Sequence, residues 1–240
     1  MSDLILSERR GDGTYITINR ADVNGVITDA MAADLADMID EAGRTSKFIV
    51  YRSAGADFCT GRDRGVNVRP KEALDYKDSS EDVFGFYDSF RRVPIPVIAA
   101  VQGRALGMGC SIAALCDIAI ACDDARFALT EMANKTLPTI AMSGLVDRVG
   151  RKGISYLTYT ALEIDAHTAL AYGIVSLVVP KADLDATLTR VIEAVGHAPL
   201  PALHAAKEYI GVAPDLDTRT AAAYAKNLHA TVNTSSRMRS

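Results

Sequence analysis

Residues 95–117 read IPVIAAVQGRALGMGCSIAALCD. Within them, Val97–Val101 is a continuous apolar run, typical of a short strand that is buried on both faces. Glycines at 103, 107 and 109 then predict a turn in which the backbone approaches another group closely. Cys110–Leu115 is predicted to form a short apolar helix. Together these elements bring backbone N–H groups and a helix N-terminus to one point, which favours negative charge.

The glycines fit phosphate-binding motifs poorly. A P-loop closes on a Lys followed by Ser or Thr, and a dinucleotide fingerprint has three glycines at fixed spacing that open a longer helix. Neither pattern is present around Gly103, Gly107 and Gly109. An oxyanion site is the better interpretation, and glycines that serve only close packing are the alternative.

Composition limits the class of protein. The chain has 240 residues, of which 49% are hydrophobic, so it can form one large domain, or one domain with a smaller lobe. A net charge of −4 and the lack of a basic run argue against nucleic-acid binding. The spacing of Cys59, Cys110, Cys116 and Cys122 fits no zinc site, which indicates buried thiols in a reducing compartment and no metal.

The sequence also argues against membrane insertion. The first residues lack the basic and apolar segments of a signal peptide. Gln102, Arg104 and Asp117 interrupt the most apolar part of the chain, which is typical of a core rather than a membrane span. We therefore expect a soluble, cytoplasmic protein that binds neither membrane nor nucleic acid.

Periodicity and turn signals predict an α/β core, residues 1–180, followed by a helical lobe, residues 181–240. The predicted strands are Asp3–Arg9, Tyr15–Asn19, Phe48–Tyr51, Val97–Val101, Ile118–Ala121, Arg126–Leu129 and Leu177–Val179. The predicted helices are Ala30–Ala42, one around Val83–Phe90, others between Leu145 and Ala161, then Ala166–Tyr172, Asp183–Val195, Pro201–Ile210 and Thr218–Thr231. Residues 58–63 are interpreted as a strand that ends at a glycine, and residues 64–80 as a surface loop.

Several motifs occur in an order typical of one family. Residues 96–109 (PVIAAVQGRALGMG), with 116–121 (CDIAIA), resemble the signature segment of the enoyl-CoA hydratase/isomerase family, the crotonase superfamily. Residues 58–63 (FCTGRD) and 125–131 (ARFALTE) are similar to two further family elements. The motifs RVG at 148–150, Ala166-x-x-Ala169, GIV at 173–175 and Lys207 follow in the expected order. The resemblance covers nearly the whole chain.

The resemblance implies a crotonase-like spiral of ββα repeats with a C-terminal helical oligomerisation lobe, assembled as a homotrimer or hexamer. It also implies an acyl-CoA substrate and no cofactor beyond the coenzyme A moiety of that substrate. By position, coenzyme A would contact Asn24, Gly25, Val26, Gly107 and the loop from Arg62 to Gly65. Lys207 is a weaker candidate for a phosphate contact, and a surface lysine is the alternative.

The chemistry shared by the family is stabilisation of a thioester enolate. By position, the two backbone donors would be Arg62 and Met108, each worth roughly 3–4 kcal/mol. Glu131 matches one of the two glutamates that the hydratases use. Ser111 stands at the place of the other and is no carboxylate base. Asp63, Asp117, Asp147 and Glu163 are possible substitutes for it, of which Asp63 and Asp117 are weak.

One retained glutamate favours isomerisation of a double bond, or an atypical hydration, by Glu131. A thioester hydrolase or decarboxylase on the same fold, and a catalytically degraded acyl-CoA-binding scaffold, are the alternatives. Gly109–Ala113 also partly mimics the nucleophile elbow of serine hydrolases. The chain's four histidines lie in its last third, and none is clearly placed to serve Ser111, so this interpretation is weak.

Overall fold

A computed structural model describes residues 3–63 and 72–239 of the chain. A central sheet of six strands has the order β1-β2-β4-β6-β8-β11. The first two strands form an antiparallel hairpin and the remaining neighbours are parallel. The strands are β1 (Ile5–Arg10), β2 (Gly13–Ile18), β4 (Phe48–Ser53), β6 (Val97–Val101), β8 (Ile118–Cys122) and β11 (Leu177–Val179). Hydrogen bonding across this sheet satisfies the backbone of the apolar strands.

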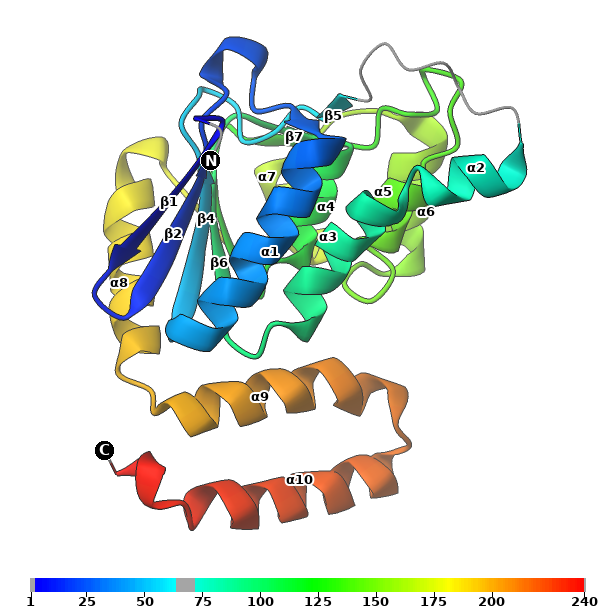
Figure 1. Cartoon of the computed structure of the whole chain (residues 1–240). Coiled ribbons are helices and arrows are strands. Elements are labelled where there is room, and N and C mark those ends of the chain that lie inside the picture. Colours follow the sequence, from blue (N-terminus) through cyan, green and yellow to red (C-terminus); the bar gives the residue numbers. More distant parts are fainter. Residues whose placement is uncertain (1–2, 64–71, 240) are drawn as a thin grey trace.

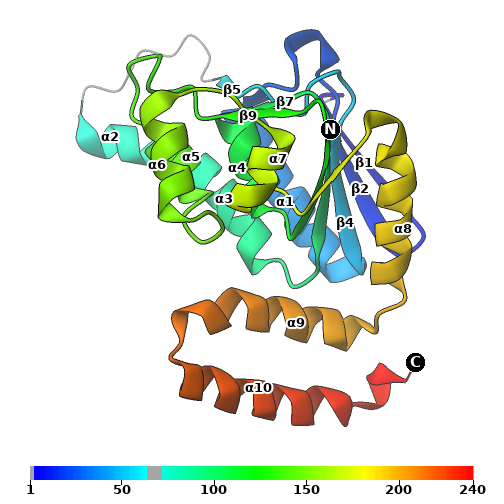
Figure 2. The same cartoon turned by 180° about the vertical axis from the view of Figure 1, so that it is seen from behind.

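Helices cover both faces of the central sheet (Figures 1 and 2). Successive side chains of a strand point to opposite faces, so the fully buried β6 contributes to two cores. Val97, Ala99 and Val101 join the larger core with α1 (Asp29–Thr45), α3 (Glu81–Arg92) and α4 (Met108–Leu115). Ile98 and Ala100 face the smaller core, which α8 (Leu184–Gly196) closes.

Two small sheets lie at the end of the central sheet where β4 and β6 finish (Figure 1). One has the order β10-β9-β7, from β10 (Ile164–Asp165), β9 (Arg126–Ala128) and β7 (Arg104–Leu106). The other pairs β3 (Ile27–Thr28) with β5 (Arg62–Asp63) in parallel. Three further short helices are α5 (Thr139–Ser143), α6 (Arg151–Thr160) and α7 (Ala166–Tyr172). Turns from several parts of the chain therefore lie close together at this end of the molecule.

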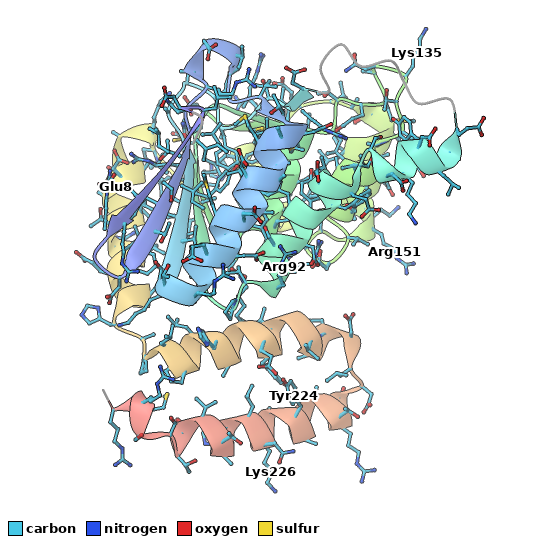
Figure 3. The ribbon with its side chains drawn as sticks, viewed as in Figure 1. Glu8, Arg92, Lys135, Arg151, Tyr224 and Lys226 are labelled. Atoms are coloured by element: carbon cyan, nitrogen blue, oxygen red, sulfur yellow. The ribbon has the colours of Figure 1, made fainter. Side chains whose placement is uncertain are left out.

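The last two helices form a hairpin below the core (Figures 1 and 2). They are α9 (Leu200–Val212) and α10 (Thr218–Asn233). Figure 3 shows Tyr224 of α10 between the two helices, where its hydroxyl donates to Glu208 of α9. No described residue of α10 is buried, whereas α8, placed in the helical lobe by the sequence, packs on the central sheet.

The long, periodic elements confirm the sequence predictions within a few residues at each end, and α7 and β11 match them fully. Two predictions were wrong. Residues 73–78 of the expected loop form α2 (Ala73–Asp78), and part of the rest lies outside the described residues. Residues 58–63 hold no strand before Gly61: Cys59 makes a single bridge to Ala105, and β5 follows the glycine.

Within the described residues, no helix has the length and apolar character needed to cross a bilayer. The same part of the chain holds no cluster of side chains suited to a metal ion.

Candidate active site

The glycine-rich turn between β7 and α4 is shaped by close contacts. Gly107 has a φ of +52°, and a Cβ added there would lie 2.7 Å from Oε1 of Glu131. A Cβ on Gly109 would lie 2.0 Å from the Cys59 carbonyl oxygen. A side chain at either position would therefore displace a neighbouring segment. The predicted close approach of the backbone is confirmed, and at Gly107 its neighbour is a carboxylate.

A cavity of about 500 Å³ opens at the N-terminus of α4. Its walls come from the β3–β5 sheet, from α3, from the start of α4 and from the segment after β9. The lining residues are Val26, Thr60, Gly61, Arg62, Tyr87, Gly107, Met108, Thr130, Glu131, Asn134, Thr136, Leu137, Pro138, Ile140 and Ala141. Segments far apart in the sequence thus meet around one space.

Glu131 is half-buried in the wall of this cavity. Its backbone carbonyl accepts from the N–H groups of Asn134 and Thr136, which fixes the turn that follows β9. The Gly107 N–H donates to the Ala128 carbonyl at 2.8 Å, which ties β9 to the start of α4. Burial raises the pKa of the Cys110 thiol in α4 to about 12, and the Glu131 charge adds a smaller effect in the same direction. Glu131 is therefore held beside the helix N-terminus.

Two residues that line the cavity, Arg62 and Met108, have backbone N–H groups that the neighbouring strand or helix does not bind. Met108 is the first residue of α4, and N–H groups in the first turn of a helix have no intrahelical acceptor. In the parallel β3–β5 ladder, Ile27 N–H donates to the Gly61 carbonyl, so the Arg62 N–H faces away from β3. Both residues line the cavity, as the oxyanion prediction requires.

The Arg62 side chain has a different role from the backbone. Its guanidinium makes two hydrogen bonds to Asp29, at 2.5 and 2.8 Å, and is 11% exposed. Asp29 is the first residue of α1, so this pair fixes β5 against that helix. The charge is thus satisfied within the protein rather than presented to a ligand.

Ser111 does not reach the cavity. The residue is fully buried, and its hydroxyl donates to the Ala141 carbonyl at 2.9 Å, with the Gly107 carbonyl at 3.2 Å. No histidine of the described chain lines the cavity either. A serine nucleophile needs an exposed hydroxyl and a base, and neither is found here. Ser111 instead ties α4 to α5.

The predicted coenzyme A contacts divide into two groups. Val26 lines the cavity, and Asn24 and Gly25 form the turn beside it, where the Asn24 carbonyl accepts from Thr60. Lys207 lies on α9 in a separate place, with its ammonium 2.7 Å from Asp117 and 2.9 Å from the Ile95 carbonyl. The structure does not bring Lys207 to the cavity. Gly65, at the end of the loop expected to contact coenzyme A, lies outside the described residues.

Sequence analysis missed Tyr87 as a cavity residue. It belongs to the apolar stripe of α3 with Val83, Phe86 and Phe90, all of them buried. A hydroxyl at one position of that stripe was the only available signal, and it does not distinguish a core residue from a cavity residue. The polar residues of the segment after β9, such as Asn134, were missed too because that segment has no periodicity.

Comparison with known proteins gives consistent results. A family model described as Enoyl-CoA hydratase/isomerase matches residues 11–240. The 2,3-dehydroadipyl-CoA hydratase of Escherichia coli (strain K12) is 30% identical over 212 residues, which cover 87% of this chain and 81% of that protein. The short-chain-enoyl-CoA hydratase of Clostridium acetobutylicum is 31% identical over 229 residues, covering 90% of this chain and 85% of that protein.

Solved structures show the same architecture. An enoyl-CoA hydratase of Mycobacterium smegmatis matches with a TM-score of 0.92 and 25% identity, covering 98% of this chain and 93% of that one. The human enoyl Coenzyme A hydratase domain-containing protein 3 matches with a TM-score of 0.91 at 23% identity, covering 98% and 94%. These matches confirm the predicted α/β fold with a helical C-terminal region.

Proposed function

The chain belongs to the enoyl-CoA hydratase/isomerase family, the crotonase superfamily, and from that premise we propose that it is an enzyme that moves a proton on an enoyl-CoA thioester. Glu131 is the acid–base residue, and the backbone N–H groups of Arg62 and Met108 bind the thioester oxygen. One observation carries the proposal. The Glu131 carboxylate lies directly against Gly107, and therefore beside the first N–H of α4, within one cavity.

The arrangement suits an enolate intermediate. Glu131 takes a proton from carbon 2 of a 3-enoyl thioester, and the electron pair moves to the thioester oxygen. The two N–H groups stabilise the negative charge there, each by roughly 3–4 kcal/mol. Glu131 then returns the proton to carbon 4, which leaves a 2-enoyl thioester. A single carboxylate suffices for both transfers, and Glu131 is the only Asp or Glu that lines the cavity in the described part of the chain.

Hydration at the same carboxylate is the second candidate. The relatives from Escherichia coli and Clostridium acetobutylicum are both named as hydratases, which favours this reaction. A water held by Glu131 would add at carbon 3, and the same N–H groups would stabilise the same enolate. Ser111 does not contribute, because its hydroxyl is buried and bonded to a carbonyl. Hydrolase, decarboxylase and scaffold functions stay as alternatives.

Three further features belong to this proposal. Coenzyme A enters past Asn24, Gly25 and Val26 and brings the thioester to Gly107, with no cofactor besides itself. The assembly is a homotrimer or a hexamer. The protein acts in the cytoplasm.

Mass spectrometry in D₂O tests the proposal. Panels of 2-enoyl- and 3-enoyl-CoA are incubated with the protein, with Glu131→Gln, and with Glu163→Gln, a carboxylate bonded to Arg104 outside the cavity. Isomerisation gives deuterium uptake and a shifted double bond without added water, and it is lost only in Glu131→Gln. A product heavier by one water establishes hydration instead. No exchange and no product on any thioester would refute both reactions and favour a hydrolase or a scaffold.

A further inference from the structure

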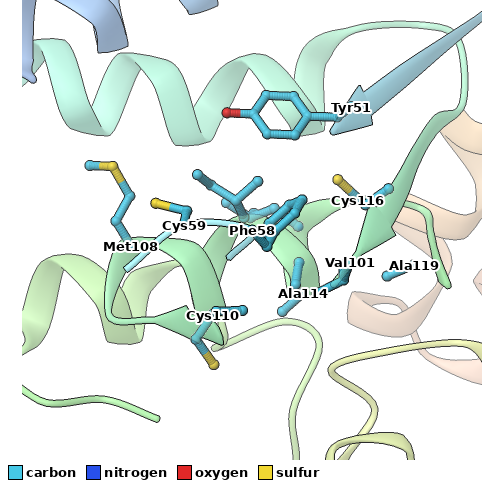
Figure 4. Packing of buried hydrophobic residues seen from close by; sticks show 14 of the residues in the cluster. Tyr51, Phe58, Cys59, Val101, Met108, Cys110, Ala114, Cys116 and Ala119 are labelled. Carbon is cyan, nitrogen blue, oxygen red and sulfur yellow. The ribbon is translucent and has the colours of Figure 1, made fainter. Parts of the chain in front are cut away.

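Different parts of the fold hold the two backbone donors. Met108 is the first residue of α4, a helix of eight residues that are all buried. Figure 4 shows Met108 near Cys59, within the buried apolar cluster. Arg62 is the first residue of β5, which has two residues and pairs with the equally short β3 in a sheet of two strands. A ladder of this size is marginal by itself, so the Arg62 donor needs a further support.

The Arg62 side chain provides this support. Its Nε and Nη2 donate to the two carboxylate oxygens of Asp29, at 2.5 and 2.8 Å. Such a two-pronged pair fixes orientation as well as distance. The Arg62 side chain is 11% exposed and that of Asp29 is 34% exposed, so the pair is partly shielded from water. The place of the Arg62 backbone therefore depends on Asp29.

Asp29 stands on a firmly packed helix. It is the first residue of α1, a 17-residue helix whose Met31, Leu35 and Ile39 are buried in the larger core. Thr28 belongs to β3, and its hydroxyl caps α1 by accepting from the Met31 N–H at 3.2 Å. A negative charge in the first turn of a helix is also favourable. Asp29 thus connects the core to the strand that carries the donor.

The position of an oxyanion donor decides its effect. Such a donor works when it lies about 2.7–3.1 Å from the place of the charged oxygen, and misplacement of about 1 Å costs about 100-fold in rate. The Arg62 donor is a backbone N–H, so any residue other than proline at position 62 would carry it. The side chain at position 62 therefore matters for the place of this N–H and not for its existence.

We propose that Asp29 is a positioning residue, which acts through the Arg62 guanidinium to hold the Arg62 N–H where the thioester oxygen acquires its negative charge. This inference rests on the proposed function, since it takes that N–H as a donor. Removing either side chain leaves the N–H in the chain but releases its support. Asp29→Ala, Arg62→Ala and the double variant should therefore all lower kcat about tenfold. KM should stay within about twofold, because the oxygen gains its charge only during the reaction.

A ligand that ionises without turnover tests the inference. Bound 3-oxobutanoyl-CoA releases a proton from carbon 2 to solvent and becomes an enolate, whose ultraviolet absorbance gives the ionised fraction at each pH. Donors at the thioester oxygen lower the apparent pKa of this ligand. In Asp29→Ala, in Arg62→Ala and in the double variant, we expect that pKa to lie about one pH unit above its value in the wild-type complex, a tenfold change. The Kd of butanoyl-CoA, which forms no enolate under these conditions, should stay within about twofold.

Asp40→Ala is the matched control. Asp40 lies further along α1 and accepts two hydrogen bonds from the Arg92 guanidinium, at 3.1 and 2.6 Å. The described lining of the cavity beside α4 includes neither residue. This variant should keep the ligand pKa and the kcat of the wild type. Asp29→Asn is a milder second variant, which should show part of the shift even if Asp29→Ala does not fold, and thermal unfolding confirms that each variant is folded.

The opposing outcomes are distinct. A wild-type ligand pKa in the folded Asp29 variants would overturn the inference and leave the proposed function standing. So would a larger shift in Arg62→Ala than in Asp29→Ala, since the guanidinium would then contact the ligand itself. An equal shift in Asp40→Ala would trace the effect to the stability of α1 and would also overturn the inference. If the wild type binds no thioester, or leaves the ligand pKa at its value in solution, the inference and the proposed function fail together.

Discussion

Two cavities of similar size are lined by different polar groups. The cavity beside α4, with Glu131 in its wall, measures about 500 Å³, and a second cavity, between α9 and the end of α3, measures about 470 Å³. In the second, Lys207 is bonded to Asp117 and the Arg91 guanidinium makes two hydrogen bonds to Asp147. In the first, the backbone N–H of Met108 lies in the first turn of α4, where a helix supplies no acceptor.

The ion pairs of the second cavity have a structural role. Asp117 accepts from the Val97 N–H as well as from Lys207, so the pair joins the starts of β6 and β8 to α9. The charges of Asp117 and Lys207 therefore stabilise the fold. In the cavity beside α4, backbone hydrogen bonds and the close contact at Gly107 hold Glu131 beside the start of the helix. Substitutions in the two cavities should therefore affect different properties.

The largest expected effect is on stability, at Asp117. Its replacement by Ala leaves Lys207, 9% exposed, without its carboxylate, and losing one partner of a buried pair costs about 3–5 kcal/mol. Lys207→Met is the matched variant and should cost less, because Asp117 keeps its hydrogen bond to Val97. Urea unfolding measures both. If Asp117→Ala costs no more than Lys207→Met, the pair is not a structural tie.

The next effect is on activity, at Gly107. An added Cβ would lie 2.7 Å from Oε1 of Glu131, and the φ of +52° disfavours any side chain. We expect Gly107→Ala to lower kcat/KM about 100-fold by shifting the carboxylate, because misplacement of about 1 Å costs that much. Steady-state kinetics on the substrate found in D₂O measures it.

Gly85→Ala is the control for this substitution. Gly85 lies within α3, and an added Cβ there meets no atom within 4 Å. The change should leave kcat/KM intact and raise stability slightly, by up to about 1 kcal/mol. Equal activity of the two variants would show that the contact between Gly107 and Glu131 does not position the carboxylate.

The sequence alone predicted the long helices and strands and the glycine-rich turn that borders the cavity beside α4. Val97–Val101 is apolar without interruption, and the α3 stripe is periodic, so local pattern and burial agree there. The short strands β3 and β7 were missed because two or three residues carry no period, although the equally short β9 and β11 were predicted. They form only where long-range pairing supplies hydrogen bonds.

The sequence predicted which residues meet at the cavity, because these positions follow from the backbone and from the motifs. Gly107, Met108, Glu131, Arg62 and Val26 do meet at one cavity. Side-chain partners were not predictable: the Arg62 guanidinium turns to Asp29, and Lys207 turns to Asp117, across 33 and 90 residues of chain. Tyr87 was missed for the same reason, because only the folded chain shows which face of a buried phenol borders a space.

A smaller effect separates the two buried phenols. Tyr51 leaves its hydroxyl unpaired in a closed core, so Tyr51→Phe should stabilise the protein by about 1 kcal/mol. Tyr87→Phe should stabilise it less, because the Tyr87 hydroxyl interacts with the side chain of Ser111. Urea unfolding of both variants, without ligand, gives the comparison. A larger gain from Tyr87→Phe would mean that Ser111 does not stabilise the Tyr87 hydroxyl.

The smallest expected effect is a pH-dependent contribution to stability from Asp147, which lines the second cavity. Burial acts to raise the pKa of Asp147, but Arg91 and Arg148 together hold it below its ordinary value of 3.8. The folded protein therefore binds this proton more weakly than the unfolded chain does. The stabilisation is complete above the unfolded pKa and is lost as the pH falls through the folded pKa.

The variant Asp147→Asn isolates this contribution. At pH 7 we expect it to cost less than about 1 kcal/mol, because Asp147 is 41% exposed and solvent screens the ion pair. The difference in unfolding free energy between wild type and variant should shrink steadily as the pH falls below 4, and urea unfolding across that range measures it. A difference that is constant with pH would mean that Asp147 acts through hydrogen bonds that need no charge. Arg91 would then be held as firmly by the amide as by the carboxylate, and the second cavity would owe its stability to packing rather than to ion pairs.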